Sequence, residues 1–115
     1  MRCKVCAEEA GWFRRWCRSC SRLWEIYRQS GEILSPADLL SAFDASGASP
    51  RQIEAFLRFD PDGEGSIEDR LAARTANALL AALGRPERQT AQDVARLRRA
   101  GRWKAYDRKP PEGFL

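Results

Sequence analysis

The 115-residue chain contains no histidine, and this absence narrows the chemistry that it can perform. Catalysis by imidazole is excluded, and so are zinc sites that combine cysteine with histidine. The sequence also has no glycine-rich phosphate loop and no nucleophile motif. We therefore expect a binding protein rather than an enzyme, with no small-molecule substrate.

Long apolar runs are absent as well. No stretch approaches the ~20 consecutive apolar residues that a membrane span requires. The N-terminus begins Met-Arg-Cys and lacks the apolar region of a secretory signal. These absences predict a soluble, cytoplasmic protein without membrane contact. In the cytosol, paired cysteines serve more often as metal ligands than as disulfides.

The chain does have four cysteines, arranged as two Cys-x-x-Cys pairs that are ten residues apart. They are Cys3, Cys6, Cys17 and Cys20. Four thiolates complete the tetrahedral shell that zinc prefers and leave no open coordination position. The pattern therefore predicts a structural zinc ion. A pair of disulfides or a single iron ion are the alternatives.

The residues around the cysteines predict a small module. Residues 7–16 are expected to form a short hairpin that turns at Gly11, and the bulky Trp12, Phe13 and Trp16 are expected to cover the metal. The apolar spacing after Cys20 predicts an amphipathic helix over residues 19–30. A hairpin that carries one pair and a helix N-terminus that carries the other give a treble-clef-like arrangement.

The run Cys17-Arg-Ser-Cys20-Ser-Arg-Leu, followed by this helix and Gly31, resembles the zinc module of zinc-bearing small-subunit ribosomal proteins. It is also loosely similar to GATA-type fingers. The resemblance covers residues 1–31 and implies zinc at the four cysteines. It further implies nucleic-acid contact by the arginines of the module, which are Arg14, Arg15, Arg18 and Arg22.

Beyond Gly31 the sequence predicts four further helices, each opened by a serine or threonine capping signal. The signals are Ser35 with Asp38, Ser49 with Pro50, Ser66 with Asp69, and Thr90 with Asp93. The expected helices cover residues 36–43, 50–59, 66–83 and 91–100. One face of the longest helix is expected to be buried and comprises Ile67, Leu71, Ala72, Thr75, Leu79, Ala82 and Leu83.

The predicted fold class is therefore mainly α. A treble-clef-like zinc module at residues 1–31 should be followed by a compact bundle of about four helices at residues 32–101. The remaining residues, 102–115, form a basic tail that contains Pro110, Pro111 and Gly113 and shows no periodicity.

Residues 59–68 resemble the calcium loop of EF-hand proteins, with Gly65 at the sixth loop position. The twelfth position holds Leu71, where that family has a bidentate glutamate. The calcium ligands that this resemblance implies are Asp60, Asp62, Glu64 and Glu68. The alternative is a turn between two helices whose acidic residues cap the second helix.

Charge is unevenly distributed along the chain, with a net charge of +4 over residues 1–30, −6 over residues 31–71 and +6 over residues 72–115. The last segment combines arginine with aromatic residues, a composition that suits phosphate contact and base stacking. Its candidate nucleic-acid contacts are Arg96, Arg98, Arg99, Arg102 and Lys104. The alternatives are a solvated arginine-rich face or a basic face that pairs with the acidic middle segment.

Together these features predict a small zinc-binding regulatory protein that contacts nucleic acid, or the transcription or translation machinery, through arginine-rich surfaces. Zinc would be structural. The alternative is a protein-protein interaction adaptor that binds its partner through exposed aromatic side chains. These are Trp12, Phe13, Trp16 and Trp24.

Overall fold

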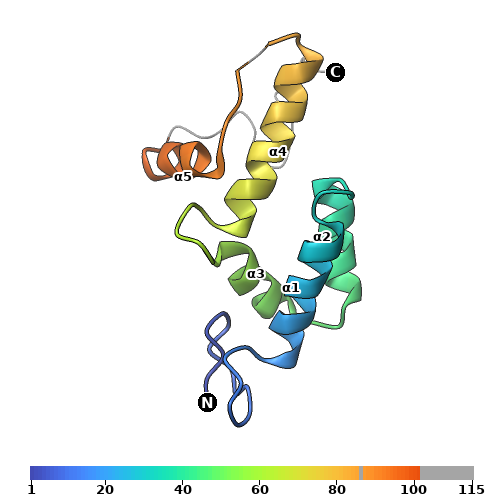
Figure 1. The fold of residues 1–115 in the computed structure, drawn as a ribbon, viewed down its shortest axis with the longest axis vertical. Helices are drawn as coiled ribbons and strands as arrows, with labels where there is room; N and C mark the ends of the chain where they lie inside the picture. Colours follow the sequence, from blue (N-terminus) through green and yellow to red (C-terminus); the bar gives the residue numbers. More distant parts are fainter. Residues whose placement is uncertain (86, 102–115) are drawn as a thin grey trace. The chain divides into compact units, whose positions relative to one another are not determined.

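The computed structural model describes residues 1–85 and 87–101, and within them the chain forms five α-helices and no strand (Figure 1). The helices are α1 (Arg18–Ser30), α2 (Pro36–Ala45), α3 (Pro50–Arg58), α4 (Ile67–Ala82) and α5 (Ala91–Arg99). The mainly helical class is confirmed. None of the helices in the described ranges combines the length and the apolar character needed to cross a membrane.

Side-chain caps explain why the helices begin where the sequence predicts. Three reciprocal capping boxes pair Ser49 with Gln52, Ser66 with Asp69, and Thr90 with Asp93. In each box the side chains of both partners accept hydrogen bonds from otherwise unpaired backbone N–H groups. At α2, Ser35 Oγ accepts a bond from Asp38 N at 3.2 Å, and Pro36 occupies the first helical position.

The chain divides into two compact units, Met1–Phe59 and Asp60–Leu115. In the first unit α1, α2 and α3 pack against one another, and in the second α4 packs against α5. The four helices that follow Gly31 are therefore shared between the two units. The predicted division into residues 1–31, 32–101 and 102–115 stays a prediction, and the tail lies outside the described residues.

The three helices of the first unit meet at an aromatic cluster around Phe56, whose side chain is fully buried. Its ring centroid lies 5.5 Å from that of Phe43 on α2 and 6.5 Å from those of Trp24 and Tyr27 on α1. All three contacts are edge-to-face, the arrangement that the charge distribution of aromatic rings favours. Each helix thus contributes to one core.

The segment that precedes α1 is irregular, and the hairpin expected over residues 7–16 is not formed. The isolated bridge found in the described part of the chain pairs Arg2 with Glu9 and encloses the first cysteine pair. Backbone turns at Ala7 (φ 63°), Gly11 (φ 86°) and Phe13 (φ 60°) explain the difference, because left-handed residues interrupt an extended strand.

In the second unit, α4 and α5 pack through small side chains. Ala73, Ala76 and Val94 are buried together, and Leu97 packs against them. The predicted buried face of α4 is partly wrong: Ile67 and Leu71 are buried as expected, but Leu80 is buried and Leu83 is 52% exposed. Ala73 and Ala76, which face α5, were not part of the predicted face.

Two contacts fix the start of α5 against the rest of this unit. The Asn77 side chain accepts a hydrogen bond from Gln89 N at 2.7 Å and donates one to Gln89 O at 2.9 Å. Gly65 has a φ of +121°, and a Cβ built on it would lie 3.0 Å from Ala91 Cβ. Glycine is therefore required at position 65 for both its conformation and its lack of a side chain.

Candidate metal centre

The four predicted cysteine ligands converge in the first unit. Their Sγ atoms all lie within 4.8 Å of one another, and the four thiols are free of disulfides. Cys6 Sγ and Cys17 Sγ are 3.7 Å apart. A tetrahedral ion with sulfur bonds of ~2.3 Å has ligand separations of ~3.8 Å, whereas a disulfide bond measures ~2.05 Å. The arrangement therefore suits one metal ion bound by four sulfurs.

Local structure explains this convergence. The first pair lies in a turn, where Ala7 N donates a hydrogen bond to Cys3 O at 3.0 Å. The second pair opens α1: Cys17 is its N-cap, and Cys17 Sγ accepts a hydrogen bond from Cys20 N at 3.4 Å. The positive end of the helix dipole thus faces the Cys17 sulfur.

The cysteine cluster is enclosed by apolar groups. Its four cysteines are between 0% and 8% exposed, and Ala10 is buried with them. Val5, Trp16 and Ala55 pack against the cluster. Ala55 belongs to α3, so the third helix helps to enclose a site whose cysteines come from the N-terminal segment and α1.

Burial and crowding set the ionisation of the thiols. Burial, followed by the neighbouring thiols of Cys17 and Cys6, raises the pKa of Cys20, and burial also raises that of Cys6. Burial opposes ionisation of Cys3 too, but backbone hydrogen bonds, mainly from Cys6 and Cys17, lower its pKa from 9.0 to about 7. Four adjacent thiolates therefore need a cation to balance their charge.

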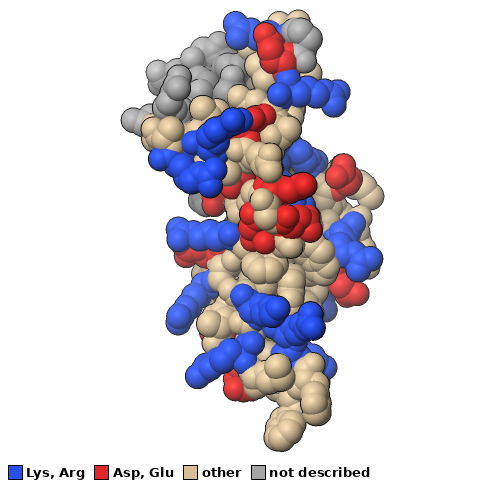
Figure 2. Space-filling view, turned by 60° about the vertical axis from the view of Figure 1, so that its left-hand side comes forward, with Lys and Arg blue, Asp and Glu red and all other residues tan. Residues whose placement is uncertain are grey.

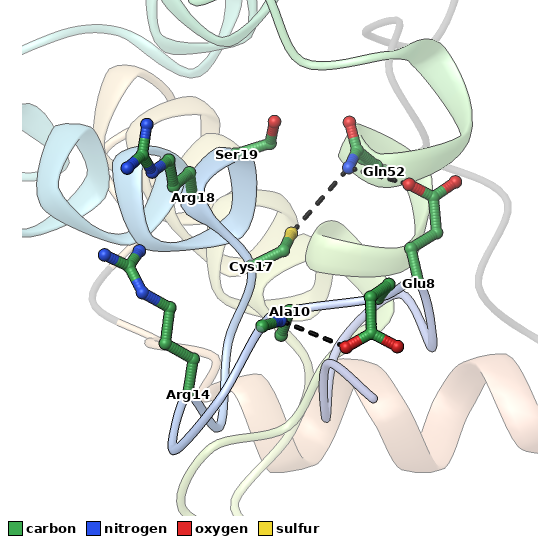
Figure 3. Close-up of a pocket in the computed structure, with 9 residues that line it drawn as sticks. Glu8, Ala10, Arg14, Cys17, Arg18, Ser19 and Gln52 are labelled. Atoms are coloured by element: carbon green, nitrogen blue, oxygen red, sulfur yellow. Dashed lines mark hydrogen bonds between the residues drawn. The ribbon is translucent and has the colours of Figure 1, made fainter. Parts of the chain in front are cut away.

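Gln52 links this cluster to α3 and was not recognised from the sequence (Figure 3). Its Nε2 lies 3.7 Å from Cys17 Sγ and donates to Glu8 Oε2 at 3.2 Å, while its Oε1 accepts a bond from Ser49 N. The capping position of Gln52 was visible in the sequence, since it lies three residues after Ser49. Its contact with sulfur depends on tertiary packing alone.

The arginines that the ribosomal resemblance singled out are gathered at one end of α1. Arg14, Arg15, Arg18 and Arg22 are all exposed. Arg14, Arg18 and Arg22 line a cavity of about 430 Å³ together with the half-buried indoles of Trp16 and Trp24. We call this the arginine groove; Ser21 and Glu25 complete its lining.

A second cavity of about 440 Å³ adjoins the cysteine cluster at Cys17 and has a mixed charge. Arg14 and Arg18 lie on one side of Cys17, and Gln52 and Glu8 lie on the other (Figure 3). Glu8 and Glu9 balance the two arginines here, so the arginine groove is the more positive of the two cavities.

The arginines of α5 are placed differently. Arg96 forms an ion pair with Asp93, and Arg98 Nη1 lies 3.4 Å from Asp69 Oδ1 and 3.5 Å from Glu68 Oε2. Arg99 is exposed, whereas Arg102 and Lys104 lie outside the described residues. On the face shown in Figure 2, basic side chains are interspersed with acidic ones. Two of the predicted nucleic-acid contacts, Arg96 and Arg98, are therefore paired with nearby acidic residues.

The acidic residues of the EF-hand-like loop make contacts typical of a turn that caps a helix. Asp60 Oδ1 and Oδ2 accept bonds from Glu64 N and Gly65 N, each at 3.0 Å. Burial acts to raise the pKa of Asp60, but these N–H groups hold it below 3.8. Asp62 pairs with Arg70 at 2.7 Å, and Glu68 pairs with Arg98. Within the described ranges, the ligand atoms that lie close enough together to hold a metal ion are those of the four cysteines.

The aromatic residues between the cysteine pairs separate into two kinds. Trp16 packs against the cysteine cluster as predicted, and its ring contacts those of Trp24 and Phe59. The prediction that Trp12 and Phe13 cover the metal is wrong, because their side chains are 86% and 87% exposed. Both residues lie in a stretch with positive φ angles at Gly11 and Phe13.

No family model matches this chain, and neither the curated proteins nor the solved structures include a significant match to it. The resemblance to the ribosomal zinc module therefore depends on the residues of the first 31 positions alone.

Proposed function

We propose that this chain is a small zinc-binding regulatory protein that contacts nucleic acid, bare or within the transcription or translation machinery, through the arginine groove. Zinc in the cysteine quartet would hold the groove in shape. The observation that carries the proposal is the position of the groove: Arg18 and Arg22 lie on the same helix whose first turn contains Cys20.

Zinc is the metal that the donor set favours. Four sulfur donors at tetrahedral spacing suit zinc, and the alternative with the same donors is iron. With every position taken by cysteine, zinc would have no site for a water molecule or a substrate. Its role would therefore be structural, and loss of the ion would also disrupt the surface that α1 presents.

Nucleic acid is the partner that the groove's chemistry favours. Arginine offers bidentate hydrogen bonds to phosphate, and the half-buried indoles of Trp16 and Trp24 provide apolar walls beside it. Arg18 and Arg22 are one helical turn apart on α1, so both guanidinium groups can reach along one strand. Glu25 also lines the groove, where three arginines outnumber it.

The test is the affinity of the zinc-loaded full chain for fluorescein-labelled oligonucleotides as the salt concentration is raised. Arg18→Gln combined with Arg22→Gln should weaken binding and reduce the slope of log affinity against log salt by about 1.5. Arg28→Gln is the matched control, because Arg28 is exposed on α1 but does not line the groove. Absence of binding at low salt, or affinity that salt does not change, would contradict the proposal.

A protein-interaction adaptor is the second candidate, and the exposure of Trp12 and Phe13 favours it. The two candidates differ in what accompanies the protein during purification. Nucleic acid that is removed by nuclease or by high salt supports the first candidate. A protein partner that remains after nuclease treatment supports the adaptor.

A further inference from the structure

We infer that the nucleic acid bound by the first unit is single-stranded, with its bases stacking on Trp12 and Phe13 and its phosphates following the arginine groove. This inference rests on the proposed function and adds that the protein prefers a single strand to a duplex.

Trp12 and Phe13 form an exposed aromatic pair. Their side chains are 86% and 87% exposed, and their ring centroids are 5.9 Å apart with the planes tilted by 58°. Leaving two adjacent large rings in water forgoes the stabilisation that burial would bring. Folding alone therefore does not explain their position.

The loop presents this pair in a defined way. Cys6 precedes the loop and Cys17 follows it, so both of its ends are held at the metal centre. Within it, Phe13 has a φ of 60°, an unusual conformation for a bulky residue. Such strain is found where function requires a particular presentation of a side chain.

Arg14 connects the aromatic pair to the arginine groove. It directly follows Phe13 in the chain and lines the groove with Arg18 and Arg22. The groove also contains Trp16 and Trp24, whose ring centroids are 5.6 Å apart. Exposed rings, arginines and indoles therefore follow one another over a short distance. This combination is typical of surfaces that bind single strands, where arginine tracks the backbone and aromatic rings stack on bases.

A double helix fits these features less well. The faces of its bases are covered by their neighbours, so Trp12 and Phe13 would have nothing to stack on unless a base left the stack. Contact with phosphates alone would require only the arginines. A membrane surface would also attract aromatic and basic side chains, but it is flat, whereas the arginines and indoles here line a cavity of about 430 Å³.

The experiment uses the zinc-loaded full chain and two fluorescein-labelled probes, a single strand of about 12 nucleotides and a duplex of the same length. We expect tighter binding of the single strand. The double variant Trp12→Ala with Phe13→Ala should weaken that binding by roughly tenfold or more and leave duplex binding unchanged. Ile33→Ala is the matched control, because Ile33 is also an exposed apolar residue of the first unit, and it should have no effect.

The possible failures are distinguishable. Equal affinity for both probes, unchanged in the double variant, would overturn the inference and leave the proposed function intact. Failure of both probes to bind at low salt would overturn both. Binding to phosphatidylserine vesicles that the double variant loses, with unchanged affinity for the single strand, would overturn the inference in favour of a membrane contact. Zinc content and circular dichroism check that each variant folds, and the exposure of both rings predicts that it does.

Discussion

The two units of this chain are built in different ways. The first unit, Met1–Phe59, combines a buried cysteine quartet with a cluster of large aromatic rings around Phe56. The second unit is described from Asp60 to Gly101 and joins its two helices through alanine, valine, backbone caps and ion pairs. One unit is thus organised around a buried cysteine cluster and aromatic rings, and the other around backbone caps and small side chains.

The difference follows from the side chains available. Among residues 1–35, one large aliphatic side chain, Leu23, is fully buried. The buried cysteines therefore take the place of an apolar core in this segment. In the second unit, small residues let α4 and α5 approach closely. Gly65 and Asn77 then set where α5 begins. The first unit should therefore depend on metal, and the second should depend on a few backbone positions.

Removal of the metal should have the largest effect and should be confined to the first unit. Structural zinc contributes about 10–16 kcal/mol of apparent binding energy in small zinc-finger peptides, as much as the total stability of many domains. A chelator, or Cys20→Ser, should abolish the hydrogen-exchange protection of α1, α2 and α3 and leave that of α4 and α5. Residue-resolved NMR measures this protection. Equal loss of protection in both units would show that the second unit also depends on the metal.

Gly65→Ala should have the next largest effect and should act on the second unit. The new Cβ would meet Ala91 at 3.0 Å in a backbone conformation that alanine avoids, so we expect a loss of about 3 kcal/mol in the free energy of unfolding. Gly63→Ala is the matched control. Gly63 also has a positive φ but nothing within 4 Å of its Cβ position, and the expected loss there is about 1 kcal/mol.

The measurement is a denaturant titration monitored by NMR signals of α4 and α5. Equal losses of unfolding free energy in the two glycine variants would show that contact with Ala91 contributes nothing.

Gln52→Ala should have a smaller effect, and it should lower both the stability and the zinc affinity of the first unit. It removes the contact with Cys17 Sγ and the bond to Ser49 N, and we expect a loss of about 1–2 kcal/mol. Zinc affinity should fall about tenfold, because partners of the ligands orient them. Competition with a chromogenic chelator measures the affinity. Gln29→Ala, at an exposed position of α1, should change neither quantity.

The smallest effect is expected at low pH, where protonation of Asp93 should destabilise α5 in the second unit. Hydrogen bonds from the Thr90 backbone and side chain, and then the Arg96 guanidinium, hold the pKa of Asp93 below 3.8. Its stabilising contribution is therefore complete above 3.8 and is lost as the pH falls through the folded-state pKa. Asp93→Asn should flatten the acid dependence of α5 stability. Acid titration followed by NMR measures this, and an identical titration in the variant would contradict the assignment.

Most helix boundaries were predictable because their signals are local. Ser35, Ser49, Ser66 and Thr90 each cap a helix that starts at the next residue. A capping hydrogen bond spans three residues, so the sequence contains everything needed to form it. The same holds for the cysteine quartet, where short spacing within each pair and the helix after Cys17 bring the sulfurs together.

Other features depend on contacts between segments that are distant in the chain. On α4, Ala73 and Ala76 are buried together with Val94 of α5, and the periodicity of α4 alone does not single out these alanines. The contact between Gln52 and Cys17 spans 35 residues, and no local pattern reports it.

The sequence by itself therefore determined the mainly helical class, the helix starts and the four candidate metal ligands, because each follows from hydrogen bonds or spacings within a few residues. Only the tertiary structure decided the grouping of the helices, the exposure of Trp12 and Phe13, and the assembly of the arginine groove. These depend on how segments pack, and an apolar or basic residue has the same local pattern whether packing covers it or leaves it exposed.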